Sequence, residues 1–234
     1  MNQDLAEIVE YYATKPHREL NDLLLGKSKD NLISSLTDLL TAYFNDKNSS
    51  SLREYVTVAI AGYKHNPNKL GYNGYKQNSA IGGKPISCEA KPKNITTEGY
   101  DQKKTKPKLK GEGSFNDYTP ERLEKDIKEK LNILSSGFID GELLYILEFP
   151  FPAIYQRLKS LLPKKRVKGT YTRSASFNFS HYEKHPGLKV IYLNKVSIEK
   201  NRHYFNAKFY KFLVSCELLW NQKMKYYKAI PLTS

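Results

Sequence analysis

The sequence is poor in cysteine and in long hydrophobic runs. Cysteine occurs only twice, as Cys88 and Cys216, which is too few for a disulfide framework and favours a reducing compartment. The longest apolar runs, such as residues 143–147, are far too short to span a bilayer. The first ten residues carry three acids and lack the basic-then-apolar layout of a secretion signal. We therefore expect a cytoplasmic protein that has no membrane partner.

Acidic residues are also in the minority. The 234 residues include 38 Lys and Arg but only 24 Asp and Glu, which gives a formal net charge of +14. Such an excess favours a polyanionic partner, either nucleic acid or an anionic membrane face, although a basic surface can also be inert. The 18 Tyr and 10 Phe, interleaved with basic residues, offer hydrogen bonds to phosphate and flat faces for bases. No long basic amphipathic helix stands out, so nucleic acid is the favoured partner.

Common catalytic signatures are missing as well. The chain has no Walker-type phosphate loop, no Gly-x-Gly-x-x-Gly and no nucleophile elbow. Its five histidines lack the spacing of zinc ligands. His181 and His185 are four residues apart, but Pro186 and Gly187 argue against a helix that would present both to one metal.

The order of the hydrophobic patterns predicts the fold class. We expect one domain over residues 1–234, with a helical part at 1–65 and a mixed sheet core at 66–234. Helices first and a mixed sheet with a crossover helix afterwards indicate an α/β (α+β) protein whose central β-sheet is flanked by helices. A helix near residues 32–44 should bury a stripe of apolar side chains: Leu32, Ile33, Leu36, Leu39, Leu40 and Phe44.

Further elements follow from local signals. A third helix is expected over 52–63, and a helix that starts at Thr119 and Pro120 should run to about Leu134. A buried strand region at 138–151 turns at Asp140-Gly141. The remaining expectations are a short helix at 154–162 and strands at 176–180, 188–193 and 204–220, the last with a helical alternative after Phe212.

A strand at residues 84–92 carries the best candidate for chemistry. Ile86, Cys88 and Ala90 share one face of this strand, which leaves Glu89 and Lys91 together on the other. A carboxylate beside an ammonium suits phosphodiester hydrolysis. Glu89 would hold Mg²⁺ next to the phosphate, while Lys91 stabilises phosphate charge or helps to orient and deprotonate the attacking water. The alternative is an ordinary salt-bridging pair on the surface.

In context, the residues around this pair resemble the PD-(D/E)xK nuclease superfamily, and within it the type II restriction endonucleases. The resemblance covers about Leu52–Asn94: a helix, an acidic position at a strand or turn, a hairpin, and a strand with Glu-x-Lys. It implies a restriction-endonuclease-like core and Mg²⁺-dependent, sequence-specific cleavage of double-stranded DNA. A symmetric target site would imply a homodimer.

The sequence departs from that family at the first metal-binding acid. No Asp or Glu stands between Glu54 and Glu89, and the most similar position is Asn73. Asn73 then serves as a variant ligand, or Glu54 supplies the missing carboxylate, as acids on the preceding helix often do in the family. The third possibility is a site without catalytic activity, in a basic protein that only binds nucleic acid. Glu54 can also be an ordinary helix residue that pairs with Arg53 or Lys64.

Other residues are candidates for DNA contact. The basic loop at 101–113 is either a solvated linker or an arm that contacts phosphate and orders on binding, and a second basic loop lies at 163–169. Glu148 lies inside the buried strand region, where it is either the partner of a basic residue or an additional acid. The side chains proposed to contact phosphates or base edges are Lys104, Lys106, Arg122, Arg157, Lys165, Arg166, Arg173 and Asn178. A module that reads single-stranded RNA by aromatic stacking is a weaker alternative.

Overall fold

The computed structural model divides the chain into two compact units. They are Met1–Ser50 and Ser51–Ser234. The residues described are 4, 7–8, 17–45, 50–66, 71–78, 83–129, 131–162, 174–221 and 226–231. The boundary between the units lies before the third expected helix, so that helix belongs with the sheet and not with the N-terminal helices.

The first unit contains helices α2 (His17–Leu25) and α3 (Lys29–Asn45). Helix α3 forms where a helix was expected, but the prediction that its apolar stripe is buried is wrong for most of its members. Ser35 is buried, whereas Ile33, Leu36, Leu39 and Leu40 are between 44% and 56% exposed. The reason is size: described helices of 9 and 17 residues are too short to enclose a core of their own.

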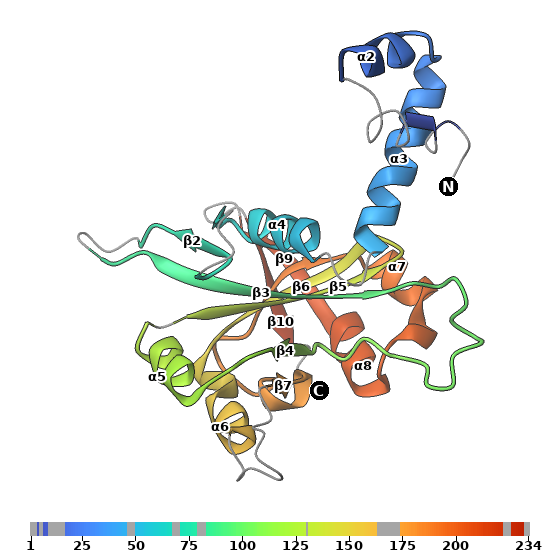
Figure 1. The fold of residues 1–234 in the computed structure, drawn as a ribbon. Coiled ribbons are helices and arrows are strands. Elements are labelled where there is room, and N and C mark those ends of the chain that lie inside the picture. The colour runs from blue at the N-terminus through green and yellow to red at the C-terminus, as the bar shows by residue number, and fades with distance from the viewer. Residues whose placement is uncertain are drawn as a thin grey trace, which may run out of the picture. The chain divides into compact units, whose positions relative to one another are not determined.

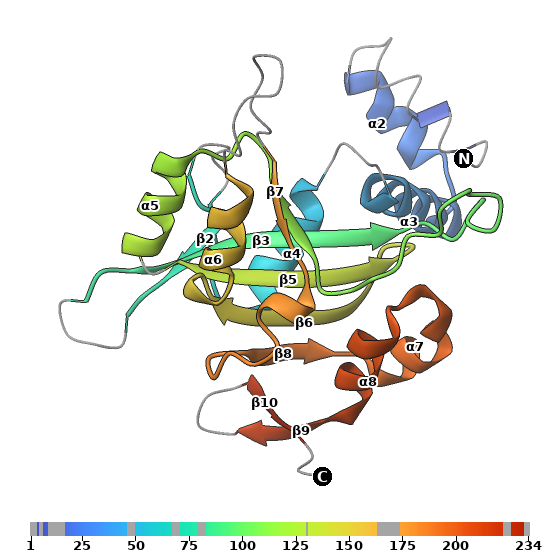
Figure 2. The same cartoon turned by 90° about the horizontal axis from the view of Figure 1, so that it is seen from below.

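The second unit is built on one six-stranded mixed sheet, in the order β1-β2-β3-β5-β6-β8. Strands β3 and β5 are parallel, and the other neighbouring pairs are antiparallel (Figure 2). Helices flank the sheet, so the expected mixed α/β class is confirmed. The strand bounds are β1 Lys64–His65, β2 Gly74–Lys76, β3 Ile86–Ile95, β5 Asn132–Ile139, β6 Glu142–Pro150 and β8 Lys189–Leu193.

Helix α4 (Ser51–Ile60) covers one face of this sheet (Figure 1). Val58 of the helix packs with Cys88 and Ala90 of β3 and with Leu134 of β5 in a small buried cluster. The predicted alternation of β3 is therefore confirmed: Cys88 and Ala90 face the helix. The residues between them, among them Glu89, point to the opposite side of the sheet.

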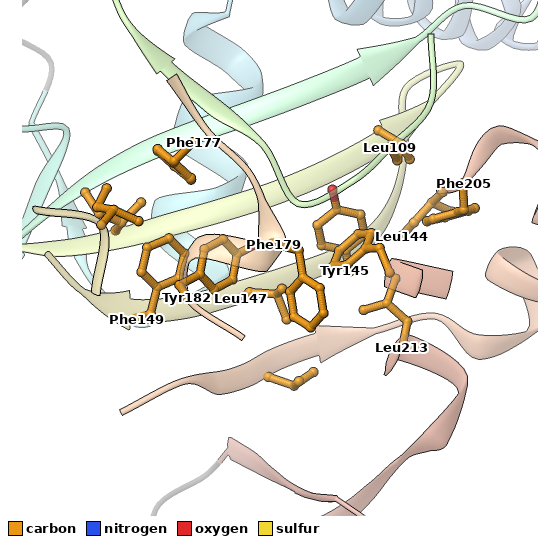
Figure 3. Packing of buried hydrophobic residues seen from close by; sticks show 14 of the residues in the cluster. Leu109, Leu144, Tyr145, Leu147, Phe149, Phe177, Phe179, Tyr182, Phe205 and Leu213 are labelled. Carbon is orange, nitrogen blue, oxygen red and sulfur yellow. The ribbon is translucent and has the colours of Figure 1, made fainter. Parts of the chain in front are cut away.

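The opposite face carries the larger core. It is covered by α5 (Pro120–Lys128), α6 (Pro152–Leu161), α8 (Ala207–Ser215) and the two-stranded ribbon of β4 (Gly113–Phe115) and β7 (Ala175–Phe177) (Figure 1). Aromatic rings fill the space beneath the sheet, as Figure 3 shows. The rings of Phe149 and Tyr182 are stacked with centroids 3.8 Å apart, and Tyr145 meets Phe209 edge-on at 5.0 Å.

Local signals placed the start of α5 correctly but not its end. Thr119 is the N-cap, its Oγ1 accepting a hydrogen bond from the backbone N–H of Arg122 at 3.3 Å, and Pro120 is the first helical residue. The helix ends at Lys128 and not near Leu134, because residues 132–139 pair with β3 and β6 as strand β5. The expected turn at Asp140-Gly141 joins β5 to β6, with positive φ at both residues.

The C-terminal expectation has the wrong order. Helix α8 comes first and is followed by β9 (Cys216–Asn221), which pairs with β10 (Tyr226–Pro231). Asn206 starts the helix, because its Oδ1 accepts hydrogen bonds from the N–H groups of Lys208 and Phe209. Phe209 and Leu213, four residues apart, then bury one helical face. The helix α7 (Lys195–Lys200) precedes this segment.

Other local expectations are close to the structure. The helix at 154–162 and the strand at 188–193 appear as α6 and β8. The strand at 176–180 is shorter than expected, because Asn178 caps a 3₁₀ turn over Phe179–His181 and ends β7 at Phe177. Within the described part of the chain, we find no helix with the length and apolarity needed to cross a membrane.

Candidate active site

The candidate site is centred on Glu89 and Lys91 of strand β3. Two residues apart, their side chains lie on the same side of the sheet, and Lys91 Nζ donates to Glu89 Oε1 at 2.9 Å. Both side chains are largely buried, with Lys91 16% and Glu89 14% exposed. The Lys91 ammonium also lies 4.2 Å from the ring centroid of Phe115 in β4. Because β4 partly covers the pair, it differs from the exposed surface salt bridge that was the alternative expectation.

The second oxygen of Glu89 is unusual. Glu89 Oε2 is buried, and no hydrogen-bond donor within the described residues reaches it. A buried carboxylate oxygen without a partner costs free energy, because it has lost its water and gained nothing in return. Such an oxygen is suited to receive a cation or a bound water. This orphaned oxygen faces the same side of β3 as Lys91.

Asn73 connects three elements of the site. It precedes β2, and its Oδ1 accepts a hydrogen bond from the backbone N–H of Ala90 at 2.8 Å. Its Nδ2 donates to Oε2 of Glu54, on helix α4, at 3.0 Å. The amide thus ties α4 to the part of β3 that carries Glu89 and Lys91. Asn73 therefore links Glu54 to the backbone between Glu89 and Lys91, although α4 and the Glu89 side chain lie on opposite faces of the sheet.

These residues fit Mg²⁺ only as a partly hydrated ion. No group of three or more His, Cys, Asp or Glu side chains that could hold a metal is found where the structure is described. Mg²⁺ commonly uses one or two carboxylates, keeps several waters and takes further oxygens from substrate phosphates. Glu89 Oε2 supplies one such carboxylate oxygen, and Asn73 links Glu54 to the backbone of the next residue, Ala90. The donors fit such a site and not an all-protein cage.

Arg122 of helix α5 adds a positive charge beside Glu89. Its Nε donates to Asp126 Oδ1 at 2.8 Å, and its guanidinium lies 4.9 Å from the ring centroid of Tyr72. Burial alone lowers the pKa of Arg122, but the hydrogen bond and charge of Asp126, with the charge of Glu89, raise it above its ordinary value. The sequence singled out Arg122 as a DNA contact, and the structure brings it to this site.

Asp126 is a residue that sequence reasoning missed. It is fully buried and accepts hydrogen bonds from the hydroxyls of Tyr72 at 2.9 Å and Tyr118 at 2.6 Å, besides the one from Arg122. Burial, followed by the acidic partner, raises the pKa of the Tyr118 hydroxyl well above its ordinary value. This buried carboxylate fixes the Arg122 side chain. The available signal was the i, i+4 spacing of Arg122 and Asp126 on one helix.

A pocket of about 590 Å³ lies between the start of β3 and the end of α5, and its described lining includes none of the candidate residues. Ile86 and Ser87, from the start of the strand that carries Glu89, form one wall. Lys128 and Glu129 come from the end of the helix that carries Arg122. The other lining residues are Asn78, Lys84 and Pro85. Space for a substrate therefore exists beside the two elements that hold the candidate chemistry.

Glu148 has the role of a buried partner for basic residues. Its two oxygens accept hydrogen bonds from Lys189 Nζ at 3.1 Å, Lys76 Nζ at 3.4 Å and the Tyr63 hydroxyl at 3.1 Å. This confirms the first of its two expected roles. Burial, and next the charge of Glu148, raise the pKa of the Tyr63 hydroxyl.

The remaining proposed DNA contacts do not gather at this site. Lys104 and Lys106 are exposed on the loop after β3, where Lys106 pairs with Asp101 at 2.7 Å. Asn178 is the cap of a 3₁₀ turn, and Arg157 Nε donates to the Ser176 carbonyl at 3.3 Å. The loop at 163–169, with Lys165 and Arg166, and also Arg173, lies outside the described residues.

The loop at 101–113 is anchored at two points. Leu109 forms a parallel bridge with Phe205 and is fully buried. The Tyr100 hydroxyl donates to the Pro107 carbonyl at 2.7 Å. The lysines of this loop are therefore exposed on a segment that is fixed to the core, and their contact with phosphate stays a prediction.

Comparisons with known proteins add no relationship. No protein-family profile matches the chain, and no curated protein matches it. The functional argument therefore depends on the geometry of the site.

Proposed function

We propose that this protein is a Mg²⁺-dependent, sequence-specific endodeoxyribonuclease of the type II restriction kind. The observation that supports it best is the Glu89 carboxylate, which has one oxygen on Lys91 and the other buried without a partner. A divalent cation would satisfy that oxygen. The net charge of +14 suits a DNA substrate.

Each residue of the site has a chemical task in this proposal. Glu89 holds the metal, with Asn73 or Glu54 completing its ligands. Lewis-acid activation of the scissile phosphate is the chemistry that bound Mg²⁺ supplies. Lys91 stabilises charge on a non-bridging oxygen of the pentacovalent phosphate, or helps to orient and deprotonate the attacking water. Arg122, held by Asp126, would add a second positive charge for the scissile phosphate.

The order of elements is consistent with the family resemblance. Helix α4 comes first, Asn73 follows at the start of a hairpin, and β3 is the strand that carries Glu89 and Lys91. The link from Asn73 to both α4 and β3 supports its assignment as the position of the family's first acid.

The proposal predicts that Lys91→Ala loses at least about a hundredfold in cleavage rate, the usual range for a residue that assists proton transfer. The assay is digestion of a large defined duplex DNA with Mg²⁺ or with EDTA, followed by mapping of the fragment ends. Lys93→Ala is the matched control, because Lys93 lies on the same strand and is exposed. DNA affinity in EDTA should change less than about threefold in either variant. Equal cleavage by the two variants would refute the site.

A protein that binds DNA without cutting it is the second candidate. It is favoured by the neutral amide of Asn73 where the resemblance implies an acid, since an amide binds Mg²⁺ more weakly than a carboxylate. In that case the digestion yields intact DNA of reduced mobility with or without Mg²⁺. Competition between duplex DNA and RNA for the protein distinguishes this candidate from an RNA-binding module, which would prefer the RNA.

Two further points belong to the proposal. A symmetric recognition site would require a homodimer, which sedimentation of the protein with and without DNA would detect. The two cysteines are unpaired and buried, which agrees with action in the cytoplasm.

A further inference from the structure

A second pocket, which has a basic lining, lies where the loop after β3 meets the segment that leads into α8. Glu89 is not part of its lining. The volume of the pocket is about 420 Å³, within the range of small-ligand sites. The cationic lining residues are Lys108, Arg202 and Lys211, together with the imidazole of His203. Phe205, Ala207 and Tyr210 form the rest of the wall. The described lining contains no carboxylate.

Backbone pairing fixes the two sides of this pocket. The Leu109 N–H donates to the Tyr204 carbonyl at 2.8 Å, and the Asn206 N–H donates to the Leu109 carbonyl at 2.9 Å. Leu109 and Phe205 are both buried, so the two segments are held by the core as well. Lys108 is therefore held opposite Arg202 by its neighbours in the chain. The pocket is a built feature and not a chance meeting of flexible side chains.

The aromatic wall orders one of the cations. The Arg202 guanidinium lies 5.3 Å from the ring centroid of Tyr210. A guanidinium held against a ring presents a fork of N–H donors that matches phosphate oxygens, and Lys108 and Lys211 add point charges. The edge of Tyr210 offers an apolar surface to a sugar or base.

We propose that this pocket binds a backbone phosphate of duplex DNA, away from the bond that is cleaved. The inference rests on the proposed function only in taking DNA as the substrate. The loop after β3, to which Lys108 belongs, leads through β4 to α5 on the side of the sheet opposite α4 (Figures 1 and 2). Phe115 of β4 contacts Lys91, so one continuous segment joins the pocket to the candidate active site. A duplex lying along this segment contacts both.

The test is fluorescence anisotropy of a labelled 30-base-pair duplex in EDTA, where no cleavage takes place. The double variant Arg202→Gln, Lys211→Gln should bind roughly tenfold more weakly than the unmodified protein, and its salt slope should fall by about 0.9, for one phosphate contact. The control is Lys159→Gln, Lys184→Gln, which removes the same charge from exposed positions outside the pocket. The control should lose less than about threefold.

A second variant keeps the test independent of folding. Lys108→Gln changes the opposite wall, is exposed, and should also weaken binding while the melting temperature stays unchanged. Equal affinities of the pocket variants and the control would overturn the inference. So would loss of ATP or inorganic phosphate binding in the double variant with duplex affinity unchanged, because the ligand would then be a free phosphate compound. Neither result depends on cleavage: DNA binding through the pocket without Mg²⁺-dependent cutting refutes only the nuclease proposal.

Discussion

Replacement of Asn73 by aspartate is the sharpest probe of the candidate metal site. In the unmodified protein, Asn73 Nδ2 donates to Glu54 Oε2 at 3.0 Å. An aspartate that keeps its bond to the Ala90 N–H would put a charged oxygen in the place of that donor. At an effective dielectric constant of about 20, two unit charges 3 Å apart repel by roughly 5 kcal/mol. Because Glu54 is partly exposed, water screens much of this, and we expect a loss of about 2 kcal/mol in the free energy of unfolding in EDTA.

The same substitution should make the protein responsive to Mg²⁺. Two facing carboxylates form a stronger cation site than one carboxylate and an amide. A ligand present at a hundred times its Kd stabilises the folded state by about 2.7 kcal/mol, so Mg²⁺ in the millimolar range should restore the lost stability of N73D. The measurement is urea denaturation with EDTA and with Mg²⁺.

N73A is the matched control, because it removes both hydrogen bonds of the amide without adding charge. It should be destabilised and insensitive to Mg²⁺. Acid should also rescue N73D in EDTA: protonation of either carboxyl abolishes the repulsion, so the deficit shrinks as the pH falls toward about 4. If N73D and N73A respond equally to Mg²⁺, the carboxylates do not form a cation site and the reasoning is refuted.

Three further predictions concern stability. D126N should lower the free energy of unfolding, measured by urea titration, by about 1.5–3 kcal/mol, because the buried carboxylate holds Arg122 and two tyrosines. The control E121Q, on the exposed face of the same helix, should have little effect in that titration. G137A would place a methyl group 2.2 Å from the Tyr145 ring and should lower the free energy of unfolding by about 1–3 kcal/mol in thermal or urea unfolding. The control G26A should be near neutral, and a near-neutral result for G137A would show that the core rearranges there. Burial raises the pKa of the Cys216 thiol from 9.0 to about 11, so its contribution to stability is complete below pH 9 and is lost as the pH rises through 11. Urea denaturation at pH 8 and 10.5 should show this decline, and C216A should reduce it.

Local patterns predicted much of the sheet and of the site. The alternation of Cys88 and Ala90 with Glu89 identified both faces of β3, and Thr119-Pro120 marked the start of α5. The family resemblance proposed Asn73 and Glu54 as partners of Glu89, and the structure links Glu54 to Asn73 and Asn73 to the Ala90 backbone. Yet α5 was expected to run on through the residues of β5, because Leu131 and Ile133 fit a helical stripe as well as a strand. Only pairing with β3 and β6 decides between the two.

What the sequence determined by itself is local: charge balance, caps, turns and the two faces of a strand, all of which depend on neighbours a few residues apart. The tertiary structure decided which distant groups meet. Asp126 looked like an ordinary helix acid until Tyr72 and Tyr118 were brought against it. The orphaned oxygen of Glu89 and the clamp of Asn73 between α4 and β3 depend in the same way on the packing of separate elements. Burial and hydrogen-bond partners are properties of the folded chain, and the chemistry proposed for the site depends on them.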